Sequence, residues 1–258
     1  MFDAEELSAA AETGDLATIQ RSFAQPGVRP ALDQAYEDSR ETYEAMIAHN
    51  SILYATQQPS EIWDRIHSLF DGVLAHGHID VLAWMFSATG SALIGDVLSI
   101  SLFGLCFSAV MTSPCGYEAC EVLVSSHVFL ERKQVERAFV LSHVLNVTIM
   151  SWHTDLIRLV VVHGVDFDNF GISVKCASSG NEQVVETLCE SGLSCVSYQA
   201  ARFCHFSENF GAVQMMIHHG MDVQASEGEH RALHIAAEDA NLDLVELYLD
   251  QGFADVDA

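Results

Sequence analysis

The chain has few basic residues. Its 258 residues include 11 Lys and Arg against 36 Asp and Glu, which gives a formal net charge of −25 at pH 7. A charge of this sign repels the phosphates of nucleic acids and the headgroups of anionic lipids. We therefore expect neither a nucleic-acid partner nor a membrane partner.

Export signals and paired cysteines are also missing. The N-terminal residues MFDAEELSAAAE are acidic where a secretory signal carries basic and then apolar residues. Seven cysteines, an odd number, show no paired spacing. These features predict a cytoplasmic protein with reduced thiols, without a structural metal ion or another cofactor.

One apolar stretch has the length of a membrane span. Residues 92–111, ALIGDVLSISLFGLCFSAVM, contain Asp96, two glycines and three serines, and they lack a basic flank. Spans of this length are normally free of such polar residues and are flanked by basic and aromatic anchors. The stretch therefore favours buried helices.

Motifs of the common enzyme classes are absent from the sequence, including G-x-S-x-G, a P-loop, H-E-x-x-H and a kinase signature. If the protein is an enzyme, two local clusters are candidates for acid–base chemistry, because their spacing brings side chains onto one helix face. Such clusters are more often solvated than catalytic, so whether the protein is an enzyme stays open. The candidates are Asp64, His67, Asp71, His76, His153 and Asp155.

An internal repeat runs along the chain. In the last copy, Leu233, Ala236 and Ala237 share one face of a short helix, and apolar residues between Leu244 and Leu249 line a second helix. Paired short helices that recur at about 33 residues predict an all-α helix-turn-helix solenoid. Copies start near Glu5, Ser68, Cys106, His143, Gly171, Gln199 and Arg231, and a degenerate pair is placed around Tyr36 to Ile66.

This repeat resembles the ankyrin repeat family. Ala232-Leu233-His234-Ile235-Ala236-Ala237 stands where that family carries Thr-Pro-Leu-His-x-Ala-Ala. The resemblance covers nearly the whole chain weakly and its last 28 residues strongly. It implies one domain, residues 1–258, with about seven or eight units and short finger loops. Trp152, Glu208 and Ala240 replace the glycine of the inter-helix turn in three units, so we expect those turns to be altered or longer.

The resemblance also implies a function. Ankyrin arrays are soluble protein-binding modules that recognise partners on a concave face. The positions that match this face are His67, His76, Met150, Phe170, Tyr198, Phe206, His230, Glu238 and Asp239. Two alternatives stay open: a diverged ankyrin-fold enzyme that acts on a small, largely hydrophobic ligand, such as a biosynthetic cyclase or isomerase, and a fragment of a longer scaffold.

The last helix is expected to leave an apolar surface uncovered. Leu242, Val245 and Leu249 recur at helical spacing on its outer side, and no further unit follows them in the sequence. Exposed apolar surface of this kind drives association. The pattern predicts a homodimer through the C-terminal unit, fraying of that unit, or a natural chain that continues beyond Ala258.

Overall fold

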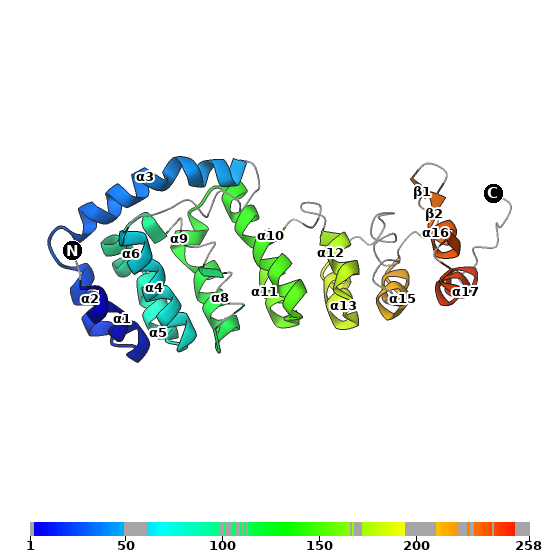
Figure 1. The fold of residues 1–258 in the computed structure, drawn as a ribbon, viewed down its shortest axis with the longest axis horizontal. Helices are drawn as coiled ribbons and strands as arrows, with labels where there is room; N and C mark the ends of the chain where they lie inside the picture. Colours follow the sequence, from blue (N-terminus) through cyan, green and yellow to red (C-terminus); the bar gives the residue numbers. More distant parts are fainter. Residues whose placement is uncertain are drawn as a thin grey trace. The chain divides into compact units, whose positions relative to one another are not determined.

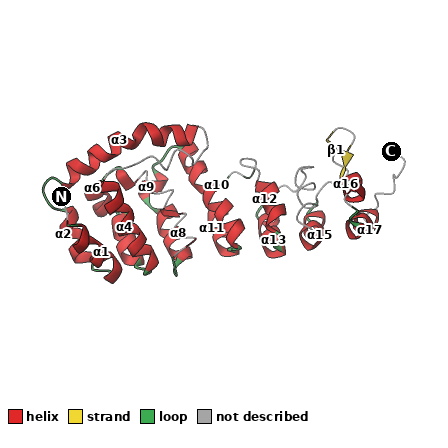
Figure 2. Cartoon of the chain, in the orientation of Figure 1, coloured by secondary structure: helices red, strands yellow, loops and turns green. Residues whose placement is uncertain are grey.

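The computed structural model describes residues 3–48, 61–98, 101, 105–106, 109, 111, 113–165, 167, 172–193, 210–220, 226–227, 230–238 and 240–250. The chain divides into two compact units, Met1–Val147 and Thr148–Ala258. Each unit contains helices that pack in antiparallel pairs (Figure 1). Apart from one short hairpin, the described elements are helical (Figure 2), which confirms the predicted all-α, ankyrin-like class.

The N-terminal unit is built from two regular helix pairs and a set of helices packed on them. Its described elements are α1 (Ala4–Thr13), α2 (Leu16–Phe23), α3 (Val28–Ala48), α4 (Glu61–Ala75), α5 (Ile79–Met85), α6 (Ala88–Ile94), α8 (Gly116–Ser125), α9 (His127–Leu130) and most of α10 (Gln134–Ser151). Helix α1 pairs with α2 and α4 with α5, while α1 also contacts α4 and α5 contacts α8. Buried side chains such as Leu7, Leu69 and Leu82 fill these contacts. Each pair therefore covers apolar surface that the next pair would otherwise expose to water.

Helix α3 is longer than an ankyrin helix and crosses several neighbours. It contacts α2, α4 and α6, and the indole Nε1 of Trp63 donates to Ser39 Oγ at 2.9 Å. Pro30 is its third residue, where a backbone N–H has no partner within the helix, and the following residues contain no glycine or proline to end it. Tyr36, near which we expected a unit to start, therefore lies inside this helix rather than at a helix start; residues 49–60 of that expected pair lie outside the described residues.

The apolar stretch at residues 92–111 is interrupted early. Helix α6 ends at Ile94, and Gly95 follows with a φ of 85°, a backbone conformation that favours glycine. None of the helices that the structure describes is long and apolar enough to cross a membrane.

The C-terminal unit is a row of helix pairs. Its described elements are the end of α10, α11 (Thr154–Val162), α12 (Ile172–Ser179), α13 (Glu182–Glu190), α15 (Phe210–His218), β1 (Ser226–Glu227), β2 (His230–Arg231), α16 (Ala232–Glu238) and α17 (Leu242–Asp250). The second helices form a continuous series, because α13 contacts both α11 and α15, and α15 contacts α17. The strands pair antiparallel, with Ser226 opposite Arg231 and Glu227 opposite His230, in the short finger that precedes α16. The number of units along the whole chain stays a prediction.

The final helix has one buried and one exposed side. Leu244 and Tyr248 are buried, as the repeat pattern predicts, whereas Leu242 is 73% and Leu249 42% exposed. Val245 is half-buried. The predicted homodimer through this side stays a prediction.

The inter-helix turns share one backbone geometry. At Gly14, Gly77, Trp152 and Ala240 the backbone is left-handed, with φ between 54° and 70°. The next residue in each case donates its N–H to the carbonyl five residues earlier, as in the 2.9 Å bond from Asp15 to Ala10 and the 3.0 Å bond from His153 to Thr148. This is a Schellman motif, which satisfies the last carbonyls of the first helix. The expectation of altered or longer turns at Trp152 and Ala240 is therefore wrong; Glu208 lies outside the described residues.

Replacing Ala240 by glycine should stabilise the last helix pair. A left-handed backbone costs a non-glycine residue about 1–2 kcal/mol, while the added freedom of glycine in the unfolded chain offsets about 0.4–1 kcal/mol. We expect a net gain of roughly 0.5–1 kcal/mol, measured as slower amide hydrogen exchange at Leu247 and Tyr248. Ala237→Gly, the same change on helical backbone in α16, should speed that exchange. Faster exchange in Ala240→Gly would contradict the strain at this turn.

Two buried thiols lie together in the N-terminal unit. Cys106 and Cys120 are both 0% exposed, and Cys120 Sγ lies 3.8 Å from the carbonyl oxygen of Cys106. Burial raises the pKa of Cys120 to about 12 and also raises the pKa of Cys106. Among the described cysteines, Cys106, Cys115 and Cys120 are free thiols.

Stability should fall at alkaline pH because of these thiols. The folded chain keeps the Cys120 thiol protonated up to a pKa of about 12, whereas the unfolded chain releases that proton near its ordinary pKa of 9.0. The free energy of the unfolded state therefore falls relative to that of the folded state as the pH rises above 9, and stability decreases with a limiting slope of about 1.4 kcal/mol per pH unit for one group. Urea unfolding at several pH values between 7 and 11 should show this loss, and Cys120→Ala should show a smaller slope. If the wild type and Cys120→Ala lose stability with pH at the same slope, Cys120 does not contribute to the alkaline loss of stability.

Candidate functional site

The six candidates for acid–base chemistry lie on exposed surfaces. Asp64, His67 and Asp71 are exposed along α4, and the ring of His67 lies 5.7 Å from that of Trp63. His76 is exposed just after α4, with Nδ1 2.9 Å from the carbonyl oxygen of Gly72. In the C-terminal unit His153 and Asp155 are also exposed, and Asp155 pairs with Arg158 at 3.2 Å. The arrangement is that of solvated helix faces, which is the commoner origin of such clusters.

The nine positions matched to a concave binding face are described in part. The side chains of His67, His76, Met150 and Glu238 are all exposed. His230 lies in β2, where only its backbone is described. Outside the described residues are Phe170, Tyr198, Phe206 and Asp239. Binding at these positions stays a prediction.

A histidine at one turn joins two helix pairs. His78 directly precedes α5, and its Nε2–H donates to the carbonyl oxygen of Glu12 in α1 at 3.0 Å. The ring occupies the space above Gly14, because a Cβ added there would lie 2.6 Å from Nδ1 of His78. The contact makes His78 a framework residue of this turn.

Gly14→Ala should destabilise the N-terminal unit through this ring. The change combines a strained backbone with a steric clash, and overpacking of this kind costs about 1–3 kcal/mol. Gly27→Ala is the matched control, because Gly27 is also left-handed but has nothing within 4 Å of an added Cβ. Urea unfolding should show the larger loss for Gly14→Ala, and adding His78→Ala should remove the difference. If both alanine variants lose the same stability, the histidine contact contributes nothing.

The turn of Met150, Ser151, Trp152 and His153, here called the Trp152 turn, is unlike the other turns. Met150 is 67% and Trp152 60% exposed, so two large apolar side chains face solvent within three residues. Trp152 has a φ of 63°, although it carries a bulky side chain that disfavours the left-handed region. An indole is therefore held in solvent by a backbone that glycine would adopt without strain.

The Trp152 turn, like the turn at His78, also lacks a side-chain helix cap. Asn181 Oδ1 accepts from Val184 N and Asn241 Oδ1 from Leu244 N, both at 3.2 Å, at the same position of their own turns. His153 makes no such side-chain bond to the start of α11. Replacing an Asn or Asp cap by a residue that cannot cap costs about 1 kcal/mol. The sequence pointed to the tryptophan alone, because the missing cap is visible only from hydrogen-bond geometry.

A metal site is not indicated in the part of the chain that the structure describes. No group of three or more His, Cys, Asp or Glu able to hold an ion is found there. The rings of His76 and His78 stack on either side of Gly77 in the sequence, with their centres 6.1 Å apart.

Residues 230–258 match the family model of the ankyrin repeat. The matched range contains β2, α16 and α17, so the last helix pair and the end of its finger are an ankyrin repeat, as the resemblance predicts. No curated protein and no solved structure matches the chain significantly. Because ankyrin repeats are in general protein-interaction modules, the match implies a role of that general kind.

Proposed function

We propose that the protein is an interaction module that binds a basic protein partner, with the Trp152 turn as an anchor. The carrying observation is the exposed indole of Trp152 on a left-handed backbone. Strained residues cluster at functional sites, because there the strain is retained for a purpose other than stability. Tryptophan is also among the residues that contribute most to protein–protein binding energy.

Stability alone would favour different residues at this turn. Glycine at position 152 would relieve about 1–2 kcal/mol of backbone strain, and Asn at position 153 would restore a cap worth about 1 kcal/mol. Both residues occur at the corresponding turn of the neighbouring helices, where Gly180 has a φ of 67° and Asn181 caps α13. The Trp152 turn therefore retains two unfavourable choices in succession, which supports a role in binding.

Charge indicates the chemistry of the partner. Residues 148–258 carry four Lys and Arg against 17 Asp and Glu. Complementary charge steers a basic partner toward such a surface and speeds association at low salt. A Lys or Arg of the partner can also lie against the face of an exposed indole, an attraction of about 0.5–1 kcal/mol at exposed sites.

The remaining candidate positions are secondary parts of this proposal. Glu238 in the C-terminal unit and His67 and His76 in the N-terminal unit are exposed where the ankyrin resemblance places concave-face contacts. We propose in addition that the partner contacts these residues on a concave face.

Selection of random peptides tests the anchor directly. A phage library of such peptides is selected on the wild-type chain, and the affinities of the recovered peptides are then measured on variants. We expect Lys- or Arg-containing peptides whose affinity falls at least tenfold in Trp152→Gly, and whose affinity weakens as salt increases. Trp152→Gly should at the same time be more stable toward urea than the wild type, so loss of binding does not come from loss of the fold.

Val162→Ala is the matched control. Val162 is 83% exposed at the end of α11, and its truncation also removes apolar surface from the C-terminal unit. Peptides selected on the wild type should bind this variant with unchanged affinity. The proposal is wrong if the recovered peptides bind Trp152→Gly as tightly as the wild type, or if they are acidic.

A further inference from the structure

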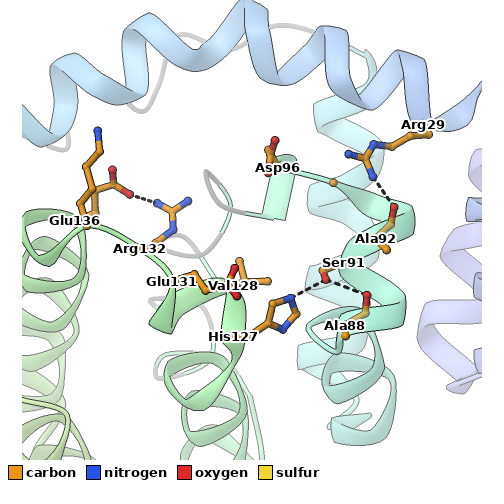
Figure 3. A pocket seen from close by; sticks show the side chains of 12 residues that line it. Arg29, Ala88, Ser91, Ala92, Asp96, His127, Val128, Glu131, Arg132 and Glu136 are labelled. Atoms are coloured by element: carbon orange, nitrogen blue, oxygen red, sulfur yellow. Dashed lines mark hydrogen bonds and ion pairs between the residues drawn. The ribbon is translucent and has the colours of Figure 1, made fainter.

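A polar pocket lies in the N-terminal unit. Its volume is about 480 Å³, within the range of small-ligand sites. Residues of α3, α6, α9 and the start of α10 form its walls (Figure 3). The charged residues that line it are Arg29, Asp96, Glu131, Arg132, Lys133 and Glu136, three of each sign. In a chain of net charge −25, this balance of charge is a local exception.

Two walls of the pocket are fixed by contacts within the unit. Arg29 donates to the carbonyl oxygen of Ala92 and pairs with Asp33 at 2.7 Å, and its guanidinium lies against Gly95, where a Cβ would be 2.8 Å from Cζ. On α6 and α9, Ser91 Oγ and His127 Nε2 are 2.9 Å apart, within hydrogen-bond distance. These contacts preorganise the pocket, which reduces the entropy lost when a ligand binds.

Arg132 forms the opposite wall and is the most constrained of the cations. Its side chain is 8% exposed, and Nη1 donates to Glu136 Oε2 at 2.8 Å and to the hydroxyl of Tyr43. The guanidinium Cζ also lies 5.5 Å from the centre of the Tyr43 ring. Burial raises the pKa of Tyr43 to about 12, so the phenol is neutral at ordinary pH. Tyr43 therefore does not neutralise the positive charge of Arg132.

One edge of Arg132 is left without an acceptor. The Nε–H is buried and unpaired, and Nη2, which lies beside it, makes no hydrogen bond in the part of the chain that the structure describes. Figure 3 shows the guanidinium between Glu136 and the interior of the pocket, with Asp96 and Arg29 beyond it. The Nε and Nη2 groups form the fork that binds a carboxylate through two parallel hydrogen bonds. A buried N–H without an acceptor is costly, so an oxyanion placed there is stabilised.

The other charges of the pocket select the rest of the ligand. Arg29 and Arg132 are each paired with a carboxylate, whereas Asp96, Glu131 and Lys133 are exposed and form no ion pair within the described residues. The two carboxylates outnumber the one unpaired ammonium group of Lys133, so together they repel a doubly charged phosphate and attract a cation. A ligand that satisfies both the Arg132 edge and these carboxylates therefore carries one charge of each sign.

We propose that this pocket binds a small zwitterion, whose carboxylate accepts from the free edge of Arg132 and whose ammonium group pairs with Asp96 or Glu131. The class comprises amino acids with uncharged side chains and short amino-carboxylates, which have no net charge, like the pocket itself. The site is separate from the proposed partner surface, so either proposal can fail without the other.

Matched probes separate the two poles of the ligand. ε-Aminocaproate carries both charges, caproate only the carboxylate and hexylamine only the ammonium group, and γ-aminobutyrate is a shorter zwitterion. Binding is followed at the Arg132 Nε–H resonance in a proton–nitrogen correlation spectrum, assigned by its disappearance in Arg132→Lys. We expect saturable shifts with at least one zwitterion, and affinity at least tenfold higher than that of caproate or hexylamine.

Variants at exposed positions test the same site when Arg132→Lys does not fold. The double variant Asp96→Asn, Glu131→Gln should weaken zwitterion binding at least tenfold and leave caproate binding unchanged or tighter. Glu37→Gln, at an exposed carboxylate of α3 outside the pocket, should change neither. The proposal is overturned if no probe gives a saturable shift, or if caproate binds as tightly as the better zwitterion. It is also overturned if inorganic phosphate binds more tightly than either zwitterion.

Discussion

The structure depends on contacts between neighbouring helix pairs. A pair such as α12 and α13 is too small to bury both of its apolar sides, so Val184, Val185 and Leu188 become a core only when adjacent helices cover them. Each fully buried leucine contributes roughly 1.5–3 kcal/mol, and these contributions accumulate along a series of interfaces. The outer side of α17 shows the converse, because Leu242 has no neighbour that covers it in the described chain and is 73% exposed.

Regular stacking leaves the turns free to differ. The Schellman geometry gives the last carbonyls of the first helix their donors, and at the Trp152 turn the side chain of the left-handed residue is exposed and under no packing constraint. Glycine is the residue with the lowest strain there, and Trp152 keeps the geometry at an energetic cost. The fold therefore tolerates a functional residue at this turn, because the neighbouring interfaces determine the path of the backbone.

Helix α3 changes what the N-terminal unit can do. It brings Arg29 to Ala92 at one end and Tyr43 to Arg132 at the other. Helix α3 thereby forms one side of the pocket. Its length follows from the absence of glycine and proline after Pro30, a local property of the sequence. The unit start expected near Tyr36 came from the repeat period alone, and an uninterrupted helix does not follow that period.

The sequence by itself determined the all-α class and the paired helices, because these depend on apolar spacing within about 33 residues. The identity of the last unit came from its resemblance to the ankyrin repeat family. It also singled out Met150 as a position that matches the binding face and Trp152 as a replacement of the turn glycine, since both stand at fixed positions of the repeat. Only the tertiary structure decided that Trp152 keeps a left-handed turn, that His153 caps nothing and that Arg132 faces a pocket. The pocket joins residues as far apart as Arg29 and Glu136, and a periodic pattern contains no information about contacts at that separation.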